Sequence, residues 1–375
     1  MGDFFPSLDD YEKDYSLRQL WHMIRGFPAV AMLGVTSLAS EGARMPDDWE
    51  LSALEYQSPH GSRQAKVLKI PAKEPRGVVG FMPGWKTSAL DKMEAIEDIR
   101  NSGYSVVSVG LANPGLETGS LADSLQRIKS FAFDGNSPLY TGFAEELPRF
   151  VVTHSTSGML FQHALIDARY QDGILPPIKH AFHTAPFFDT SGSSKDFHPV
   201  SNWLYTRHAK RHFNELAGTP LMDRLYYYIR GISRMLEEED PFVRPTHGQI
   251  LEISQYGSSY FKRKEQELVS GGAAATLPQT FVISTDDSFS CPRTAKKAAD
   301  LERAEIRLCK ARHNPLLVPP VRRSIIERLV DLTVPPEFAD YLNDLLPETD
   351  NGDPVGVGAG TGLSDDGDQP QYQFT

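Results

Sequence analysis

The sequence predicts an α/β fold in which a mostly parallel central sheet is flanked by helices and interrupted by a helical insertion. Short runs of β-branched and aromatic residues alternate with segments whose apolar residues recur at helical spacing. Repeated strand–helix alternation is typical of βαβ units, which build parallel sheets with helices on both faces. The alternation lapses over residues 190–275, an aromatic stretch that reads as helical, and then resumes.

Composition limits the classes of function. The chain has 375 residues, of which 40% are hydrophobic, and a formal net charge of −11. Ten acidic residues and no Lys or Arg follow position 328, so the rest of the chain carries about −1. A body this close to neutral gives no electrostatic reason to expect a nucleic-acid partner. The two cysteines, Cys291 and Cys309, form no disulfide framework, and we expect a reducing, cytoplasmic location.

The first 45 residues are expected to form a helical N-terminal arm. Residues 16–25 give its clearest helical pattern. The apolar run that starts at Phe27 and ends near Ala39 is shorter than the roughly 18 to 20 residues that span a bilayer. We therefore expect the arm to pack on the body or to contact a membrane surface from the cytoplasmic side.

The body follows in order. Residues 49–70 contain two strand-like pieces around Pro59-His60-Gly61, which indicates a hairpin. A compact apolar run at 77–82 predicts a buried strand, residues 88–101 predict a helix, and 104–109 predict the next strand. Later strands are expected at 150–152, 178–185, 280–284 and 306–310. We assign the core to 46–189 and 276–345, a helical cap to 190–275, and a disordered acidic tail to 346–375.

The segment Thr153-His154-Ser155-Thr156-Ser157-Gly158 joins a short apolar run to a helix-forming stretch. A serine on a sharp strand-to-helix turn is lifted toward a substrate, and the turn needs small residues where the two backbones crowd each other. The outer positions here are Thr153 and Ser157 in place of two glycines. The structural alternative is an ordinary loop in which Ser155 only caps the helix.

A serine nucleophile needs a base to take its proton and a third group to orient that base. Asp286 and Asp287 follow the strand expected at 280–284, and His313 follows the last strand. Carboxyl ends of parallel strands meet at one edge of a sheet, so serine, acid and histidine are expected to converge there. Asp286 and Asp287 both remain candidates for the acid.

The developing oxyanion of acyl transfer needs two backbone N–H donors. One is expected from Thr156, directly after Ser155 at the start of a helix. The other is expected from the loop after Met82, at Trp85, where Gly84 permits a tight turn. The structural alternative for Pro83-Gly84-Trp85 is a simple turn.

Three segments together resemble the bacterial lysophospholipase and monoacylglycerol-lipase-like α/β-hydrolases. The 153–158 segment is similar to their G-H-S-T-G-G elbow, 185–189 to their S-P-F-x-D segment, and 312–325 to their histidine loop with its closing helix. The resemblance runs from about residue 49 to 332. It implies Ser155 as nucleophile, His313 as base, Asp287 as orienting acid, and Trp85 and Thr156 as oxyanion donors.

The chain departs from that family at three places. Pro83-Gly84 replaces the usual His-Gly, both elbow glycines are replaced, and the loop after the acid is one residue longer than usual. The extra residue keeps Asp286 as a rival to Asp287. The replaced residues leave the substrate and the catalytic efficiency open.

No other pattern predicts a cofactor or a metal. His208 and His212 stand four residues apart, but the glutamate of the H-E-x-x-H zinc motif is missing between them, so a solvated helix face is expected. His180 and His183 would point to opposite faces of a strand and so could not share a ligand. The chain contains no G-x-G-x-x-G or Walker sequence that would bind a nucleotide.

The predicted function is a cofactor-free serine hydrolase of carboxylic esters. The aromatic insertion suggests an apolar acyl group, as in a lysophospholipid, a monoacylglycerol or a similar small-molecule ester. The same three residues would also serve an acyltransferase, an amidase or a lactonase. The alternative of a different class is a non-catalytic protein of the same fold that binds a small molecule or a partner, for which the altered elbow is the best support.

Overall fold

The computed structural model describes the body of the chain: residues 46–59, 61–85, 87, 89–111, 120–171, 177–188, 207, 210–211, 247–269, 277–287, 290–311 and 313–333. The expected N-terminal arm and acidic tail lie outside these residues. So does most of the expected cap, apart from the helix α8 and three isolated positions.

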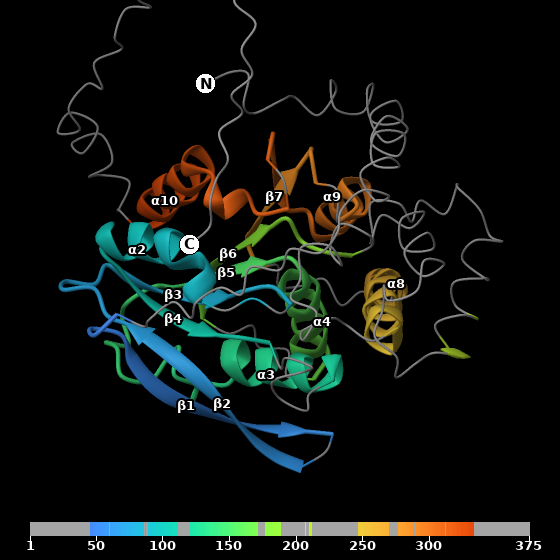
Figure 1. Cartoon of the computed structure of the whole chain (residues 1–375), viewed down its shortest axis with the longest axis horizontal. Coiled ribbons are helices and arrows are strands. Elements are labelled where there is room, and N and C mark those ends of the chain that lie inside the picture. Colours follow the sequence, from blue (N-terminus) through green and yellow to red (C-terminus); the bar gives the residue numbers. More distant parts are fainter. Residues whose placement is uncertain are drawn as a thin grey trace, which may run out of the picture.

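The centre of the body is an eight-stranded, mostly parallel sheet, as the sequence predicts (Figure 1). Its strands are β1 (Glu50–Ser58), β2 (Gly61–Ile70), β3 (Gly77–Met82), β4 (Tyr104–Val109), β5 (Arg149–His154), β6 (Ile178–Thr184), β7 (Gln279–Ser284) and β8 (Glu305–Cys309). They lie in the order β1-β2-β4-β3-β5-β6-β7-β8. β1 and β2 form an antiparallel hairpin, β2 pairs antiparallel with β4, and every later pairing is parallel.

The sequence of each strand explains its place. Every residue of β3, β4, β5 and β7 is buried, which matches their continuous apolar runs and the helices on both faces. β1 lies at the edge and alternates between exposed and buried residues over its second half. The hairpin turn falls between Ser58 and Gly61, where Gly61 has φ 107°, a conformation that favours glycine.

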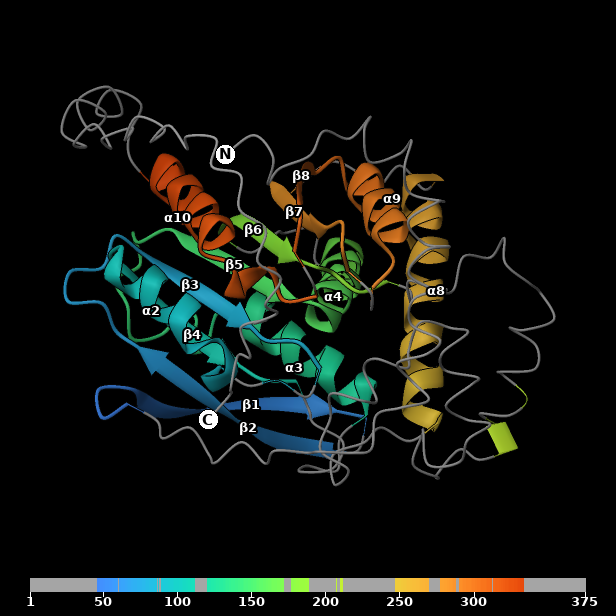
Figure 2. The ribbon, with the colours of Figure 1, turned by 45° about the horizontal axis from the view of Figure 1, so that its top comes forward.

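Helices cover both faces of the sheet (Figure 2). They are η1 (Leu90–Lys92), α2 (Met93–Asn101), α3 (Leu121–Phe133), α4 (Thr156–Gln171), α8 (His247–Val269), α9 (Pro292–Glu302), η3 (Pro315–Leu317) and α10 (Pro319–Thr333). The helix predicted over residues 88–101 is divided between η1 and α2. Neighbouring strand residues point to opposite faces, so Val151 joins the apolar cluster under α3, α4, α8 and α9, whereas Val152 joins the cluster under α2 and α10.

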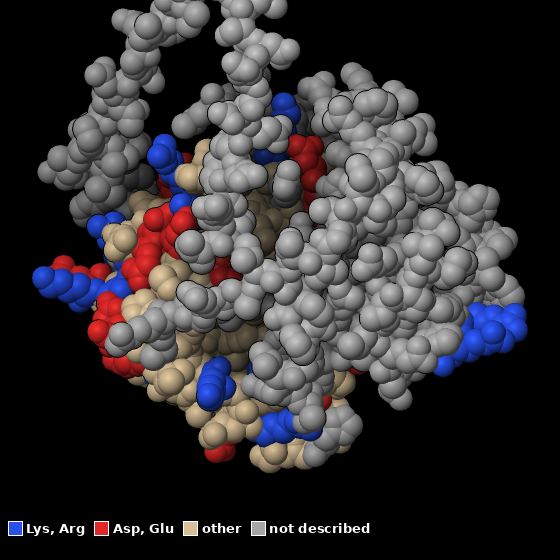
Figure 3. Space-filling model, in the orientation of Figure 1, with Lys and Arg blue, Asp and Glu red and all other residues tan. Residues whose placement is uncertain are grey.

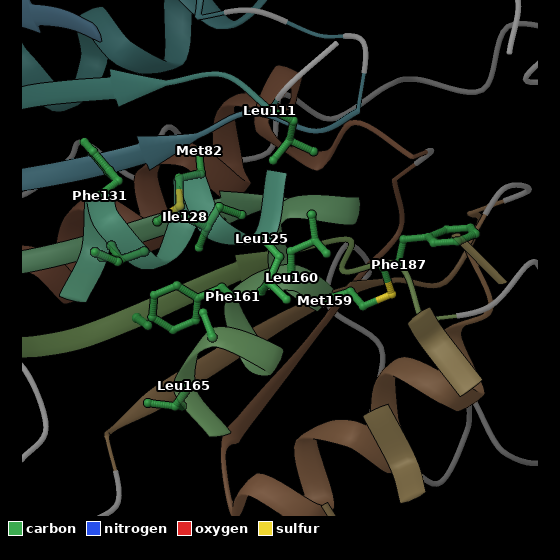
Figure 4. Close-up of a cluster of buried hydrophobic side chains, with 14 of the residues drawn as sticks. Met82, Leu111, Leu125, Ile128, Phe131, Met159, Leu160, Phe161, Leu165 and Phe187 are labelled. Atoms are coloured by element: carbon green, nitrogen blue, oxygen red, sulfur yellow. The ribbon is translucent and has the colours of Figure 1, made fainter. Parts of the chain in front are cut away.

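Apolar side chains from α3 and α4 fill the cluster on their face of the sheet (Figure 4). Ile128 and Phe131 of α3 pack with Leu160 and Phe161 of α4, and all four are at most 1% exposed. Met82, the last residue of β3, belongs to the same cluster. The cluster therefore reaches the end of the sheet at which the strand-following loops begin.

A buried set of charges joins α4, α8 and α9. Lys264 Nζ lies 2.5 Å from a Glu267 carboxylate oxygen and 3.0 Å from Glu302, and Arg169 lies 3.1 Å from Glu302. The Tyr260 hydroxyl donates to the same glutamate at 2.9 Å. Two positive and two negative side chains balance one another, which is the condition under which buried charges are tolerated.

On the opposite face, ion pairs connect α2 to α10. Arg322 lies 2.6 Å from Asp98 and 3.4 Å from Glu94. Acidic and basic side chains accordingly lie close together over these helices (Figure 3). No helix within the described ranges is both long and apolar enough to cross a bilayer.

Four buried histidines predict a loss of stability in acid. Burial lowers the pKa of His163, His180 and His183 to about 4 and that of His154 well below its usual range, because charging an imidazole away from water is unfavourable. The unfolded chain binds more protons than the folded one between about pH 6.5 and pH 4. The free energy of unfolding should therefore fall as pH drops through this window.

We expect His183→Gln to reduce the difference in unfolding free energy between pH 7 and pH 4.5, by on the order of 1–3 kcal/mol. Urea unfolding at both pH values measures this difference. Between pH 7 and pH 9 these imidazoles are neutral in both states, so the curves of the two proteins should run parallel there. An unchanged acid dependence in His183→Gln would show that this imidazole does not titrate on unfolding.

Candidate active site

The turn between β5 and α4 holds Ser155 in a left-handed conformation, with φ 55°. Few non-glycine residues adopt this region, and those that do are often at functional sites. Backbone hydrogen bonds secure it: Ser155 N–H donates to Thr184 O at 3.0 Å, and Ser155 O accepts from Gly158 and Phe187 at 3.0 and 3.1 Å. The serine side chain is therefore presented on a strained and firmly held turn, as a nucleophile elbow requires.

Ser157, in the position of an elbow glycine, makes its own contacts. Its hydroxyl lies 2.7 Å from Met82 O and accepts from His154 N–H at 3.0 Å. It thus ties the elbow to the end of β3. The replacement of glycine at this position is compensated by hydrogen bonds.

Thr153 replaces the other glycine, and its Oγ1 lies 2.7 Å from His183 Nδ1. The tightest position is Gly158, directly after Ser157. A Cβ on Gly158 would lie 3.1 Å from both Thr153 Oγ1 and Pro186 Cβ. The crowding of strand and helix falls on Gly158, so Thr153 and Ser157 can carry side chains.

The sheet brings the three predicted side chains together. His313 Nε2 lies 2.8 Å from Ser155 Oγ, and His313 Nδ1 lies 2.8 Å from Asp287 Oδ2. An ionised carboxylate only accepts hydrogen bonds, so Nδ1 carries the proton, and in the neutral ring Nε2 is free to accept from the serine hydroxyl. This is the arrangement of nucleophile, base and orienting acid.

The carboxylate at the imidazole is that of Asp287. The Asp287 side chain is 1% exposed, and Ser290 holds both of its oxygens: the hydroxyl donates to Oδ2 at 2.5 Å and the N–H to Oδ1 at 2.9 Å. Asp286 is turned toward the neighbouring Thr285, whose hydroxyl lies 3.5 Å from it. The sequence spacing did not decide which of the two aspartates contacts the histidine. In the structure, the aspartate that contacts His313 is Asp287.

The loop after β3 comes close to the serine. A Cβ on Gly84 would lie 3.1 Å from Ser155 Cβ, which is closer than side chains usually pack, so a larger residue would require the serine turn to move by a few tenths of an ångström. Gly84 O accepts from Thr87 N–H at 3.3 Å and from its hydroxyl at 3.0 Å. The Trp85 N–H, on the other side of the same trans peptide, points away from that turn. Thr156 begins α4, whose first N–H groups lack a partner within the helix.

Three residues that sequence reasoning did not select also line this region. Ser290 supports Asp287, and its only sequence signal is a serine three places after an aspartate, a spacing typical of local side-chain turns. Lys92 Nζ donates to Asn314 Oδ1 at 2.6 Å across 222 positions of sequence. No local pattern could have revealed that pair.

Other sequence candidates stay apart from the site. His180 contacts Phe182 and Thr280, whereas His183 lies among Phe161 and Phe281 on the other face, as strand geometry predicts. His208 and His212 lie outside the described residues. Over the part of the chain that is described, no three His, Cys, Asp or Glu side chains gather as a metal site would need.

Comparisons with known proteins identify the fold. No family model matches the sequence, and no curated protein does. A soluble variant of monoglyceride lipase from Saccharomyces cerevisiae, solved with a substrate analog, is 16% identical, with 80% of this chain and 98% of that one covered and a TM-score of 0.54. A lipase in its open form is 14% identical, with 76% and 98% covered and a TM-score of 0.53.

The α/β hydrolase GrgF from Penicillium sp. sh18 is also 14% identical, with 76% of this chain and 98% of that one covered and a TM-score of 0.52. The chain therefore has the α/β-hydrolase fold, which confirms the predicted fold class and the recognition of the fold from its motifs.

The left-handed turn gives a stability prediction that is independent of any activity. We expect Ser155→Gly to be more stable than Ser155→Ala by about 1 kcal/mol, because glycine adopts φ 55° without the Cβ clash. Urea unfolding of the two variants measures the difference. The matched control is Ser130, inside α3, where the order should reverse because glycine is the poorer helix former. Equal stabilities at position 155 would mean that its backbone is not strained.

Proposed function

We propose that the protein is a serine hydrolase that cleaves carboxylic esters through an acyl-enzyme. The observation that carries the proposal is the continuous contact from Ser155 Oγ through His313 to Asp287, with 2.8 Å on each side of the imidazole. Proteins of similar fold include a monoglyceride lipase and another lipase, which agrees with this chemistry.

In the proposed reaction, Ser155 Oγ attacks the ester carbonyl while His313 Nε2 takes the hydroxyl proton. The carbonyl oxygen becomes an oxyanion, for which the N–H groups of Trp85 and Thr156 are the proposed donors. His313 then delivers its proton to the leaving alcohol, and the acyl group remains on Ser155. Water attacks the acyl-enzyme, gives a proton to His313 and releases the carboxylic acid, after which the proton returns to Ser155.

Asp287 keeps its charge throughout this cycle. Its carboxylate accepts a hydrogen bond from the Nδ1–H group, holds the ring in the tautomer that leaves Nε2 available, and stabilises the imidazolium while the ring carries two protons. The two hydrogen bonds from Ser290 keep the carboxylate in the orientation that this role requires.

The proposed substrates have an apolar acyl group, as lysophospholipids and monoacylglycerols do. Segments that contact Ser155 carry large apolar side chains: Trp85 follows Gly84, Met159 lies one helical turn beyond the serine, and Phe187 donates its N–H to Ser155 O. Met159 and Phe187 lie close together in Figure 4 and belong to the same apolar cluster as Trp85. All three side chains are buried, so the surroundings of the serine turn are apolar, which favours a hydrocarbon chain over a charged acid.

We expect a fluorophosphonate probe to add one phosphonyl group to the protein, at Ser155. Intact-mass measurement gives the stoichiometry and peptide mapping gives the position. Ser155→Ala should remain unlabelled, and Ser157→Ala, which removes a neighbouring hydroxyl, should still be labelled. A natively folded wild-type protein that neither reacts nor hydrolyses a p-nitrophenyl ester series, lysophospholipid or monoglyceride would instead support a non-catalytic binding protein.

The two aspartates provide a matched pair of variants. Asp287→Asn should lower kcat by about 10³- to 10⁴-fold, because an amide cannot hold the imidazole in the required tautomer. Asp286→Asn should leave kcat within about threefold, since this side chain faces Thr285. Steady-state kinetics on a p-nitrophenyl ester measure both. The reverse order would assign the orienting role to Asp286.

A further inference from the structure

A buried lysine contacts the loop that carries His313. Lys92 ends η1, is 3% exposed, and donates from Nζ to Asn314 Oδ1 at 2.6 Å. Asn314 directly follows His313 and begins the turn of η3. A buried ammonium is costly unless it has a specific partner, so its presence beside the imidazole loop calls for an explanation.

His154, next to Ser155, lies beside the same loop. The centroid of its ring is 5.2 Å from that of His313, and its Nδ1 lies 3.2 Å from both Thr184 O and Thr184 Oγ1. Burial lowers the pKa of His154 well below its usual range, so the ring is neutral and carries one proton. A carbonyl only accepts, so Nδ1 donates to Thr184 O.

Two buried contacts therefore flank His313. On one side, Lys92 donates to Asn314 and holds the His313 loop to η1. On the other side, the ring of His154 lies beside that of His313 and is held by Thr184 O, which also accepts from Ser155 N–H at 3.0 Å.

The charges around Lys92 show what its ammonium does. Burial lowers the pKa of Lys92 to about 8, and Asp91 partly offsets this effect, so at neutral pH the side chain is mainly charged. The other titratable groups facing this region are His154 and His313, whose rings lie 5.2 Å apart. Glu94 and Asp98 on α2 are engaged by Arg322 of α10. The positive charge of Lys92 adds to burial in lowering the pKa of His154.

We propose that Lys92 is a positioning residue for His313, which fixes the His313 loop to η1 through its hydrogen bond with Asn314. This inference rests on the proposed role of His313 as the base. It adds a group that touches neither substrate nor reacting atoms, and it explains why a lysine is buried between α2 and the His313 loop.

The test compares Lys92→Met with wild type in steady-state kinetics. Loss of the ammonium should lower kcat/KM by about tenfold or more, because the base is less firmly held. The loss should fall on kcat and leave KM nearly unchanged, because Lys92 orients the base without contacting the substrate. The matched control is Lys179→Met, at an exposed position at the start of β6, which should stay within about twofold of wild type.

Asn314→Leu breaks the same hydrogen bond from the other side. It should lower kcat/KM by a similar factor, again through kcat. The double variant should be no worse than the more impaired single variant, since both remove one contact. This pair also keeps the proposal testable if Lys92→Met does not fold.

Histidine NMR at a fixed pH gives a readout that needs no turnover, with the His313 signals identified from their absence in His313→Gln. The His313 ring signals should shift or broaden in Lys92→Met and Asn314→Leu and keep their wild-type positions in Lys179→Met. Failure of the probe to label wild-type Ser155 would overturn the proposed hydrolase without affecting this measurement. A folded Lys92→Met with unchanged kcat, KM and His313 signals would overturn the role of Lys92.

Discussion

The left-handed backbone at Ser155 is the constraint on which the rest of the site depends. A side chain at φ 55° is unfavourable, and the surrounding contacts hold it there: Thr184 and Phe187 bond to the serine backbone, and Gly84 approaches its Cβ. The parallel register of β5, β6, β7 and β8 then places the Asp287 and His313 loops at the same edge. Strain at one residue is thus offset by contacts from the loop after β3, from the end of β6 and from the segment that follows β6.

Much of this arrangement could be read from the sequence, because it rests on local patterns. Apolar runs located the strands to within a few residues, and their order placed Ser155, an aspartate and His313 at one edge. Asp286 and Asp287 could not be separated, because adjacent residues in a loop share the same sequence context and only the turn decides which one faces the imidazole. Lys92 and Asn314 were not found, because their contact depends on how α2 packs against the loop after β8.

The departures from the glycine pattern show how a fold tolerates altered motifs. Thr153 and Ser157 add hydroxyl groups to a crowded interior, and each finds a partner, His183 and Met82 O respectively. Buried polar groups cost stability only when they are unpaired. The requirement for a small residue is met one position later, at Gly158. The turn therefore keeps the close packing and the hydrogen bonds that the motif requires, although the amino acids at two of its positions differ.

The packing of α8 has a consequence for how this protein could be re-engineered. Gly257 of α8 lies so near Phe188 that a Cβ there would fall 2.0 Å from its carbonyl oxygen, and Phe188 also contacts the ring of Tyr260. Any side chain larger than that of glycine at position 257 would therefore push α8 away from the segment that follows β6. Tyr260 and Lys264 lie on the same helix and reach Glu302 of α9, so such a substitution would also pull apart the buried charges between these helices.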